Sequence, residues 1–242
     1  MSQSQIRAVV LDIEGTTTPI DFVHKTLFGY ARERVEEFLR RHWEDPEVRA
    51  DVARLEAEHA AEPADSSLSP WRNDPAAVTS YVYWLMDRDR KSTGLKSLQG
   101  KIWEAGYGSG ELRGEVYPDV LPALERWQRD GVEVAIFSSG SVQAQRSLFR
   151  SSSVGDLTRF ISSYFDTRTG PKAAPASYTQ IAAALGHSPS RVLFVSDVTT
   201  ELDAAQRAGM ATALSVRPPA VPPTASGHPV IRSFDELFEE SA

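Results

Sequence analysis

The stretch IRAVVLDIEGTTTPI, residues 6–20, decides the fold of this chain. Its first six residues form a short apolar run rich in β-branched side chains, and Asp12 and Gly15 end that run. Such a run predicts a buried β-strand. An acidic residue directly after a buried strand lies where open parallel sheets bind their ligands, so Asp12 is also the first candidate site residue.

Helices and apolar strands alternate in the second half of the chain, after Gly114. A helix is predicted over residues 120–130, where Gly131 ends it. The strands that follow are predicted over residues 133–137, 161–165, 191–195 and 211–216, of which 161–165 has the weakest pattern. Strands separated by helices imply right-handed crossovers and a parallel sheet.

The stretch between the first strand and Gly114 has a helical pattern and no convincing strand. Helices are predicted over residues 22–43, 46–60, 75–86 and 95–103. We therefore expect an α/β fold, a doubly wound parallel-sheet (Rossmann-like) core with an inserted all-helical cap domain. The expected boundaries are 1–20 and 116–242 for the core and 21–115 for the cap.

Two loops are predicted from composition. Residues 106–110 are rich in glycine but lack the ending of a nucleotide-binding loop, and we interpret them as a flexible return from cap to core. Residues 217–223 contain four prolines and are interpreted as an extended surface loop.

Composition excludes several classes of protein. The 242 residues are 41% hydrophobic and 24% charged, as in ordinary globular domains, and the formal net charge of −7 argues against binding to nucleic acids or anionic lipids. No apolar run is long enough for a membrane span or a signal peptide. The chain has no cysteine, which rules out disulfides and thiolate chemistry and agrees with a reducing compartment. A cytoplasmic protein is expected.

Polar residues follow the predicted strands at one edge of the sheet. Asp12 follows the first strand, Ser138 and Ser139 follow the second, and Asp197 follows the strand at 191–195. Lys172 lies in a loop before the helix that leads into that last strand. Carboxylates, hydroxyls and one amine in a single crevice can hold a divalent cation together with a phosphate group.

Each of these residues also has a simpler interpretation. Asp12 can end a strand, Ser138 and Ser139 can be turn residues, Lys172 can be solvated, and Asp197 can cap a helix. Their occurrence together, in the order that phosphoryl transfer requires, favours the functional interpretation.

The motifs resemble those of the haloacid dehalogenase superfamily, whose first motif is usually Asp-x-Asp-Gly-Thr. Here the second acid is Glu14, and this departure narrows the resemblance to the enolase-phosphatase E1 family of methionine salvage. The match runs from residue 10 to about 217 and includes the insertion. The segments that carry it are residues 12–20, 98–104, 110–112, 138–142, 165–167 and 196–198, together with Lys172 and Glu201.

The resemblance implies a two-step reaction on 2,3-diketo-5-methylthiopentyl-1-phosphate, an enolisation followed by removal of phosphate to give an acireductone. It implies one Mg²⁺ per chain, a monomer and a small phosphorylated diketone as the only partner. Carried over by position, the metal ligands are Asp12, Glu14 and Asp197, and the substrate contacts are Ser138, Ser139 and Lys172.

The residues themselves suggest how such a site works. A phosphate dianion repels a carboxylate nucleophile, so Mg²⁺ and Lys172 must supply positive charge before Asp12 can attack and form an aspartyl phosphate. Glu14 is the candidate general acid and base, for the leaving oxygen and for enolisation. Whether Glu14 meets the metal through its side chain or its carbonyl stays open at this point.

The cap offers candidate contacts to the methylthio tail, namely Tyr81, Trp84, Trp103 and Tyr107. Aromatic residues at helical spacing more often belong to a hydrophobic core. Lys96, Lys101 and His24 are similarly ambiguous, and solvated side chains are the simpler interpretation.

Two other functions stay open. The first is a phosphatase of the same superfamily that acts on other small phosphorylated metabolites. The second is a non-catalytic phosphometabolite-binding module, although a binder gains nothing from an anionic nucleophile facing phosphate. A metal-free dehalogenase is disfavoured because it does not need the additional acids.

Overall fold

The computed structural model describes residues 6–63, 67–221 and 227–238. The chain divides into two compact units, Met1–Val23 with Arg113–Ala242, and His24–Leu112. We call them the core unit and the helical unit, and describe each by itself.

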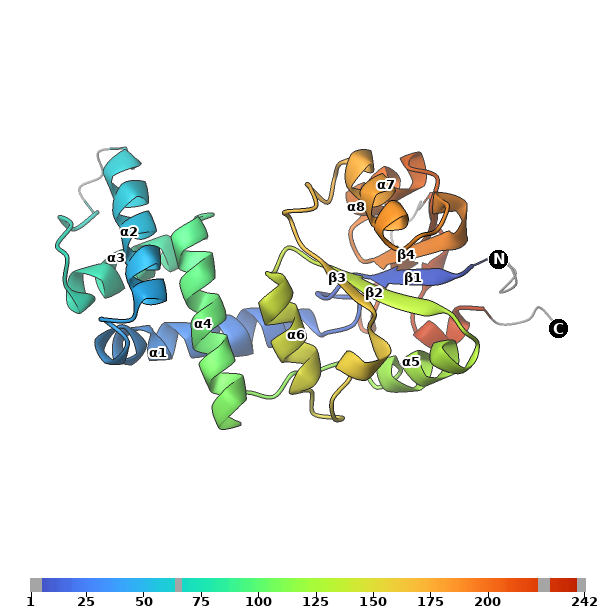
Figure 1. The fold of residues 1–242 in the computed structure, drawn as a ribbon, viewed down its shortest axis with the longest axis horizontal. Coiled ribbons are helices and arrows are strands. Elements are labelled where there is room, and N and C mark those ends of the chain that lie inside the picture. Colours follow the sequence, from blue (N-terminus) through green and yellow to red (C-terminus); the bar gives the residue numbers. More distant parts are fainter. Residues whose placement is uncertain (1–5, 64–66, 222–226, 239–242) are drawn as a thin grey trace. The chain divides into compact units, whose positions relative to one another are not determined.

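The core unit contains a six-stranded parallel sheet with the order β3-β2-β1-β4-β5-β6 (Figure 1). The strands are β1 (Ala8–Leu11), β2 (Glu133–Phe137), β3 (Ser163–Phe165), β4 (Val192–Ser196), β5 (Ala211–Ser215) and β6 (Val230–Ile231). The order reverses direction between β1 and β4, which is the point where ligands bind in doubly wound sheets. The predicted α/β fold with a doubly wound parallel sheet is confirmed.

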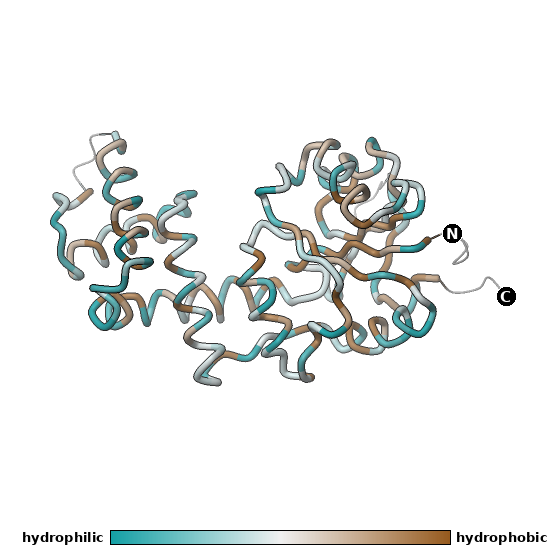
Figure 2. The backbone as a smooth tube through the Cα atoms, in the orientation of Figure 1, coloured by the Kyte–Doolittle hydropathy of each residue, from teal (hydrophilic) through white to brown (hydrophobic). Residues whose placement is uncertain are grey.

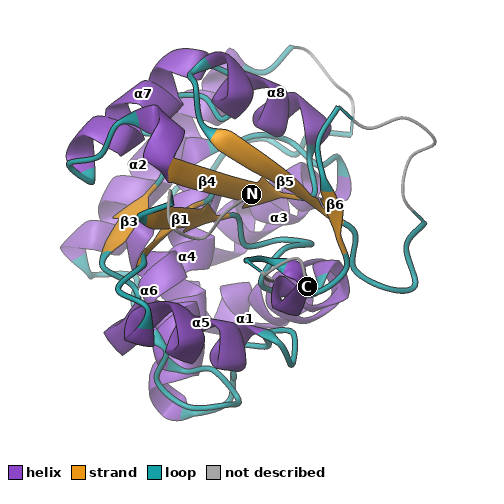
Figure 3. Ribbon diagram, turned by 90° about the vertical axis from the view of Figure 1, so that its right-hand side faces the viewer, coloured by secondary structure: helices purple, strands orange, loops and turns teal. Residues whose placement is uncertain are grey.

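Helices cover both faces of this sheet (Figures 1 and 3). One face carries α5 (Val120–Arg129) and α6 (Val142–Arg150), and the other carries α7 (Pro175–Ala184) and α8 (Thr199–Arg207). All four residues of β1 are fully buried, because a strand in the middle of a covered parallel sheet meets helices on both sides. This explains why β1 is a continuous apolar run, and Figure 2 shows the hydrophobic colouring of the central strands.

The helical unit contains α1 (Phe28–Arg41), α2 (Pro46–Ala61), α3 (Pro75–Asp87) and α4 (Thr93–Ser109), and a π-helical segment, Phe22–Leu27, leads into it. Asp45 and Asp74 each cap a helix whose first residue is proline, and their carboxylates accept a backbone N–H. The Ser92 hydroxyl caps α4 by accepting the N–H of Leu95. The apolar faces form a second hydrophobic core, separate from that of the sheet.

The prediction of a flexible return at residues 106–110 was wrong. Residues 106–109 are the last turn of α4, and Gly110 ends this helix in a left-handed conformation with φ of 78°. A Cβ on Gly106 would lie 2.8 Å from the ring of Tyr30, so glycine lets α4 approach α1 closely. Glycine at this position serves helix packing, not flexibility.

The interpretation of residues 217–223 as a surface loop was wrong for its first residue. Arg217 is buried, with 7% of its surface exposed, whereas Val221 is 85% exposed. Residues 222 and 223 lie outside the described part of the chain.

None of the described helices is both long enough and apolar enough to cross a bilayer.

Candidate active site

The strand register brings the predicted site residues to one edge of the sheet. Leu11, at the end of β1, is paired with Ile136 on β2 and with Val195 on β4. Asp12 therefore follows the central strand, between the loop that begins at Ser138 and the loop that begins at Asp197. This is the switch point at which a ligand is expected.

The Asp12 carboxylate is held on both oxygens. It is 4% exposed, and its Oδ1 accepts from the backbone N–H of Ile13 at 2.8 Å and lies 2.7 Å from Lys172 Nζ. Ser196 Oγ lies 3.3 Å from its Oδ2. A carboxylate held on both oxygens keeps a fixed orientation, as a nucleophile requires.

Lys172 is paired with two acids. Its Nζ lies 2.7 Å from Asp12 and 2.6 Å from Glu201 Oε2, and its side chain is only 11% exposed. Burial disfavours the ammonium, but the two carboxylates outweigh this effect and raise the pKa of Lys172. The Tyr178 hydroxyl donates to the Lys172 carbonyl at 2.6 Å, which fixes the backbone. Lys172 is therefore a positioned cation, and the solvated interpretation was wrong.

The loop from Asp12 to Thr18, which we call the nucleophile loop, turns tightly around one carbonyl. The N–H groups of Thr16, Thr17 and Thr18 all donate to Ile13 O, at 3.2, 2.9 and 2.8 Å. Gly15 has φ of 66°, and a Cβ there would lie 2.6 Å from Asp197 Cγ. Glycine is thus required for the backbone conformation and for the close approach of Asp197 to the loop.

The electrostatics of the site leave an excess of negative charge. Burial, followed by the neighbouring Asp12 carboxylate, raises the pKa of Asp197 to about 7. The same two causes raise the pKa of Glu201, although Lys172 opposes them. The site thus has three carboxylates, those of Asp12, Asp197 and Glu201, and one ammonium, that of Lys172. A bound divalent cation would reduce the repulsion among the carboxylates, so these residues fit the magnesium ion that the family resemblance implies.

The described residues contain no group of three or more acidic or histidine side chains arranged to hold a metal ion. The predicted ligands Asp12, Glu14 and Asp197 therefore do not form a closed three-carboxylate site. Glu14 is partly buried, and its backbone pairs with Thr18 within the nucleophile loop. Mg²⁺ commonly uses one or two carboxylates with phosphate and water, so Asp12 and Asp197 can suffice as its charged ligands.

Ser138 and Ser139 lie in the turn after β2. The backbone N–H of Ser138 donates to Phe165 O at 3.2 Å, and its hydroxyl accepts from the N–H of Gly140 at 3.3 Å. Ser138 is partly buried and Ser139 is exposed. Both are at the same sheet edge as Asp12, as predicted, and a hydroxyl is a group that can donate to a phosphate oxygen.

The aromatic candidates of the helical unit divide into two pairs. Tyr81 and Tyr107 are buried in that unit, in agreement with the simpler interpretation as core residues, whereas Trp84 and Trp103 are partly exposed. The Trp103 indole donates to Leu27 O at 2.8 Å.

The lysines of α4 also differ from each other. Lys96 is exposed, but Lys101 lies 2.6 Å from the fully buried carboxylate of Asp51, so the solvated interpretation was wrong for Lys101. This ion pair joins α4 to α2 within the helical unit.

Three site residues were given no role in the sequence prediction. Ser196 ends β4 and lies between Asp12 and Glu201, 3.0 Å from Glu201 Oε2. Glu201 is part of a motif that assigns it no role, and no pattern in the sequence indicates Tyr178. Glu201 lies four residues after Asp197 in the first turns of α8, a spacing that could have indicated a second acid at the site.

Comparisons with known proteins agree with this geometry. A family model described as haloacid dehalogenase-like hydrolase matches residues 6–209. The enolase-phosphatase E1 of Synechococcus elongatus is 57% identical over 233 residues, which are 96% of this chain and 98% of that protein. This chain belongs to the enolase-phosphatase E1 family.

Two further comparisons agree. The enolase-phosphatase E1 of Enterobacter is 46% identical, covering 97% of this chain and 98% of that protein. The crystal structure of the UTR4 protein from Saccharomyces cerevisiae has a TM-score of 0.78 at 34% identity, covering 96% of this chain and all of the yeast chain. The predicted family is confirmed, and so is the prediction of a phosphatase enzyme.

Proposed function

We propose that this chain converts 2,3-diketo-5-methylthiopentyl-1-phosphate, through its enol phosphate, to the acireductone 1,2-dihydroxy-3-keto-5-methylthiopentene and phosphate, in methionine salvage. The observation that carries this proposal is the contact of Asp12 Oδ1 with Lys172 Nζ at 2.7 Å, at the switch point of the sheet, in a member of the E1 family. A carboxylate nucleophile and a fixed ammonium are the two groups that phosphoryl transfer to an aspartate needs.

In the phosphatase step, Asp12 attacks phosphorus and the oxygen of the substrate leaves. The ammonium of Lys172 reduces the repulsion between the Asp12 carboxylate and the phosphate dianion, and Glu201 keeps Lys172 in place on its other side. The hydroxyls of Ser138 and Ser139 donate to the phosphate oxygens. Water then hydrolyses the aspartyl phosphate, which restores Asp12.

Glu14 is assigned the proton transfers. It lies two residues after Asp12 in a loop whose shape is fixed by backbone hydrogen bonds. Its carboxyl group would protonate the leaving oxygen, and its carboxylate would activate the hydrolytic water. The same group is our candidate base for enolisation, which requires removal of a proton next to a carbonyl.

One Mg²⁺ is assigned to Asp12 and Asp197, with the Glu14 carbonyl as a third ligand. When bound, the ion supplies positive charge that neutralises the phosphate and polarises the carbonyl group of the substrate. The excess of carboxylates over ammonium groups supports this assignment, as does the raised pKa of Asp197.

The helical unit is assigned the role of a cap domain that selects the methylthio tail. Trp84 and Trp103 are its candidate contacts because these two residues are only partly buried. A cytoplasmic monomer is part of the same proposal. The absence of cysteine agrees with a reducing compartment, and the family resemblance supports a monomer. Gel filtration tests the oligomeric state.

The test is an assay of the purified chain with the diketone phosphate, with and without Mg²⁺. Formation of the acireductone is followed by absorbance and phosphate release by a coupled assay. We expect both products only with Mg²⁺, and we expect Asp12→Asn to abolish phosphate release with an unchanged circular dichroism spectrum, because the amide is a poor nucleophile. Faster hydrolysis of sugar phosphates or phosphoglycolate than of the diketone phosphate would replace the proposal with a general phosphatase.

A further inference from the structure

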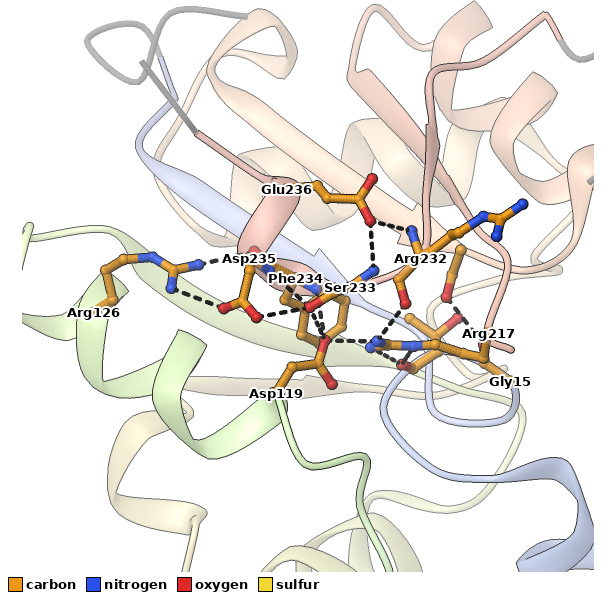
Figure 4. Close-up of polar contacts among 11 residues, drawn as sticks. Gly15, Asp119, Arg126, Arg217, Arg232, Ser233, Phe234, Asp235 and Glu236 are labelled. Atoms are coloured by element: carbon orange, nitrogen blue, oxygen red, sulfur yellow. Dashed lines mark hydrogen bonds and ion pairs between the residues drawn. The ribbon is translucent and has the colours of Figure 1, made fainter. Parts of the chain in front are cut away.

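Arg217 is a buried cation that contacts the nucleophile loop. It follows β5, and its guanidinium donates twice to the carbonyl of Thr16, from Nε at 3.0 Å and from Nη2 at 2.6 Å (Figure 4). The third nitrogen, Nη1, lies 2.6 Å from Asp119 Oδ2. One arginine therefore joins the nucleophile loop to a residue about 100 positions away in the sequence.

The surroundings of Arg217 are built to keep a charge buried. Burying a guanidinium is costly unless it is paired and hydrogen-bonded, and Asp119 supplies the opposite charge. The rings of Tyr117 and Phe234 lie 4.5 and 4.4 Å from the guanidinium carbon, close enough for two cation–π contacts. The backbone of Tyr117 also donates to Thr17 O at 2.9 Å, which adds another bond to the same loop.

A second anchor lies next to the first. The hydroxyl of Ser215, the last residue of β5, donates to the carbonyl of Gly15 at 3.1 Å. Consecutive carbonyls of the loop, those of Gly15 and Thr16, are thus both held from the β5 side. The loop bonds described above close on Ile13 O, so they fix the internal shape of the loop but not its place on the sheet.

We propose that Arg217 is a positioning residue for phosphoryl transfer. By holding the Thr16 carbonyl, it fixes where the second half of the nucleophile loop lies on the sheet, and so where Glu14 meets the phosphate. Asp12 itself is held on the sheet by β1 and by its backbone N–H, which donates to Val195 O at 3.0 Å. This inference deepens the proposed function and rests on it for the identity of the reaction. A displacement of about 1 Å in a reacting group can cost on the order of 10²-fold in rate, so a clamp on the loop backbone has a measurable effect.

Lysine cannot reproduce this clamp. An ammonium is a point charge on a flexible stem, whereas the planar guanidinium donates to Thr16 O and to Asp119 at the same time in a fixed geometry. Arg217→Lys therefore keeps the charge beside Asp119 but has one donor nitrogen in place of three, and Arg217→Met removes the charge and all the donors.

The chain offers a matched control in Arg126. Its Nη2 donates to Phe234 O at 2.8 Å and its Nη1 lies 3.4 Å from Asp235 Oδ1, so it holds the same C-terminal segment that surrounds Arg217. Its described bonds go to that segment and none of them to the nucleophile loop. Arg126→Met thus loosens the surroundings of the clamp without removing the clamp.

The experiment measures kcat and KM for the diketone phosphate and for p-nitrophenyl phosphate, together with amide hydrogen exchange by mass spectrometry. We expect Arg217→Met to lower kcat on the order of 10²-fold with little change in KM, Arg217→Lys to lower it less, and Arg126→Met to leave it near the parent value. Exchange in the peptide covering residues 12–20 should rise in both Arg217 variants and stay slow in β4.

Unchanged exchange in that peptide, or a rise of equal size in every peptide of the core unit, would overturn the inference. If Arg217→Met does not fold, Arg217→Lys decides the question by the same readouts. A chain that hydrolyses p-nitrophenyl phosphate but not the diketone phosphate would contradict the proposed function alone. The exchange measurement needs no substrate and tests the clamp in either case.

Discussion

Gly15→Ala is the substitution for which the structure gives the most definite expectation. Two effects add at this position. The φ of 66° costs a residue with a Cβ about 1–2 kcal/mol. The new methyl group would also lie 2.6 Å from Asp197 Cγ, whereas carbon atoms normally approach to about 3.5 Å, so the carboxylate and the loop must separate by about 1 Å.

Gly131→Ala separates the two effects. Gly131 has nearly the same φ, 69°, and a Cβ there meets nothing within 4 Å. Both variants should therefore lose stability through the backbone, and a loss of about 1–2 kcal/mol lowers the Tm by roughly 2–8 °C. Only Gly15→Ala should lose activity, on the order of 10²-fold in kcat, because only there does Asp197 move.

The assay compares thermal unfolding by circular dichroism with kcat for p-nitrophenyl phosphate, at saturating and at limiting Mg²⁺. We expect Gly15→Ala to be less active under both conditions and to require more Mg²⁺. If it turned over as fast as the parent, the close packing of Asp197 against the loop would be unimportant for catalysis. If Gly131→Ala lost as much activity, the loss would come from lowered stability and the reasoning would fail.

Three further expectations each concern one acidic residue. Glu201→Gln should lower kcat, measured at saturating substrate, on the order of 10–10²-fold, because Lys172 loses its second carboxylate. Normal turnover would show that Glu201 has no role at the site. Asp51→Asn should destabilise the helical unit by about 1–3 kcal/mol in thermal unfolding, because Lys101 loses a buried anionic partner, while the hydrolysis of p-nitrophenyl phosphate stays normal. An unchanged Tm would contradict this expectation. Glu14→Gln should slow hydrolysis of the diketone phosphate by about 10²–10⁴-fold and that of p-nitrophenyl phosphate less, because nitrophenolate leaves without protonation, and equal losses would exclude the acid role.

Strands in the middle of the sheet could be predicted well, and the reason is physical. β1, β2 and β4 are buried on both faces, so each is a short continuous run of apolar residues with a polar residue at its end. The two-residue strand β6 has no such pattern, and we did not predict it. Its place in the sheet depends on pairing with β5, which local sequence does not specify.

The site was predictable where a residue follows a strand, and not where its role depends on a distant partner. Asp12 and Asp197 could be placed from the strand ends alone. Gly106 looked like a flexible position because its neighbour Tyr30 lies far away in the sequence. Arg217 looked like part of a proline-rich loop because Thr16, its acceptor, is 201 positions away. Only the folded chain brings these pairs together.

The position of β1 in the sheet sets an order for folding during synthesis. β1 is translated first, but both of its neighbours come much later, β2 at residues 133–137 and β4 at residues 192–196. The helical unit, residues 24–112, is complete before either of them has left the ribosome. We expect this unit to fold first, while β1 is still unpaired and its apolar side chains are exposed. The nascent chain is thus most prone to aggregation between the synthesis of β1 and that of β4, and slowing translation over this interval should lengthen its dependence on chaperones.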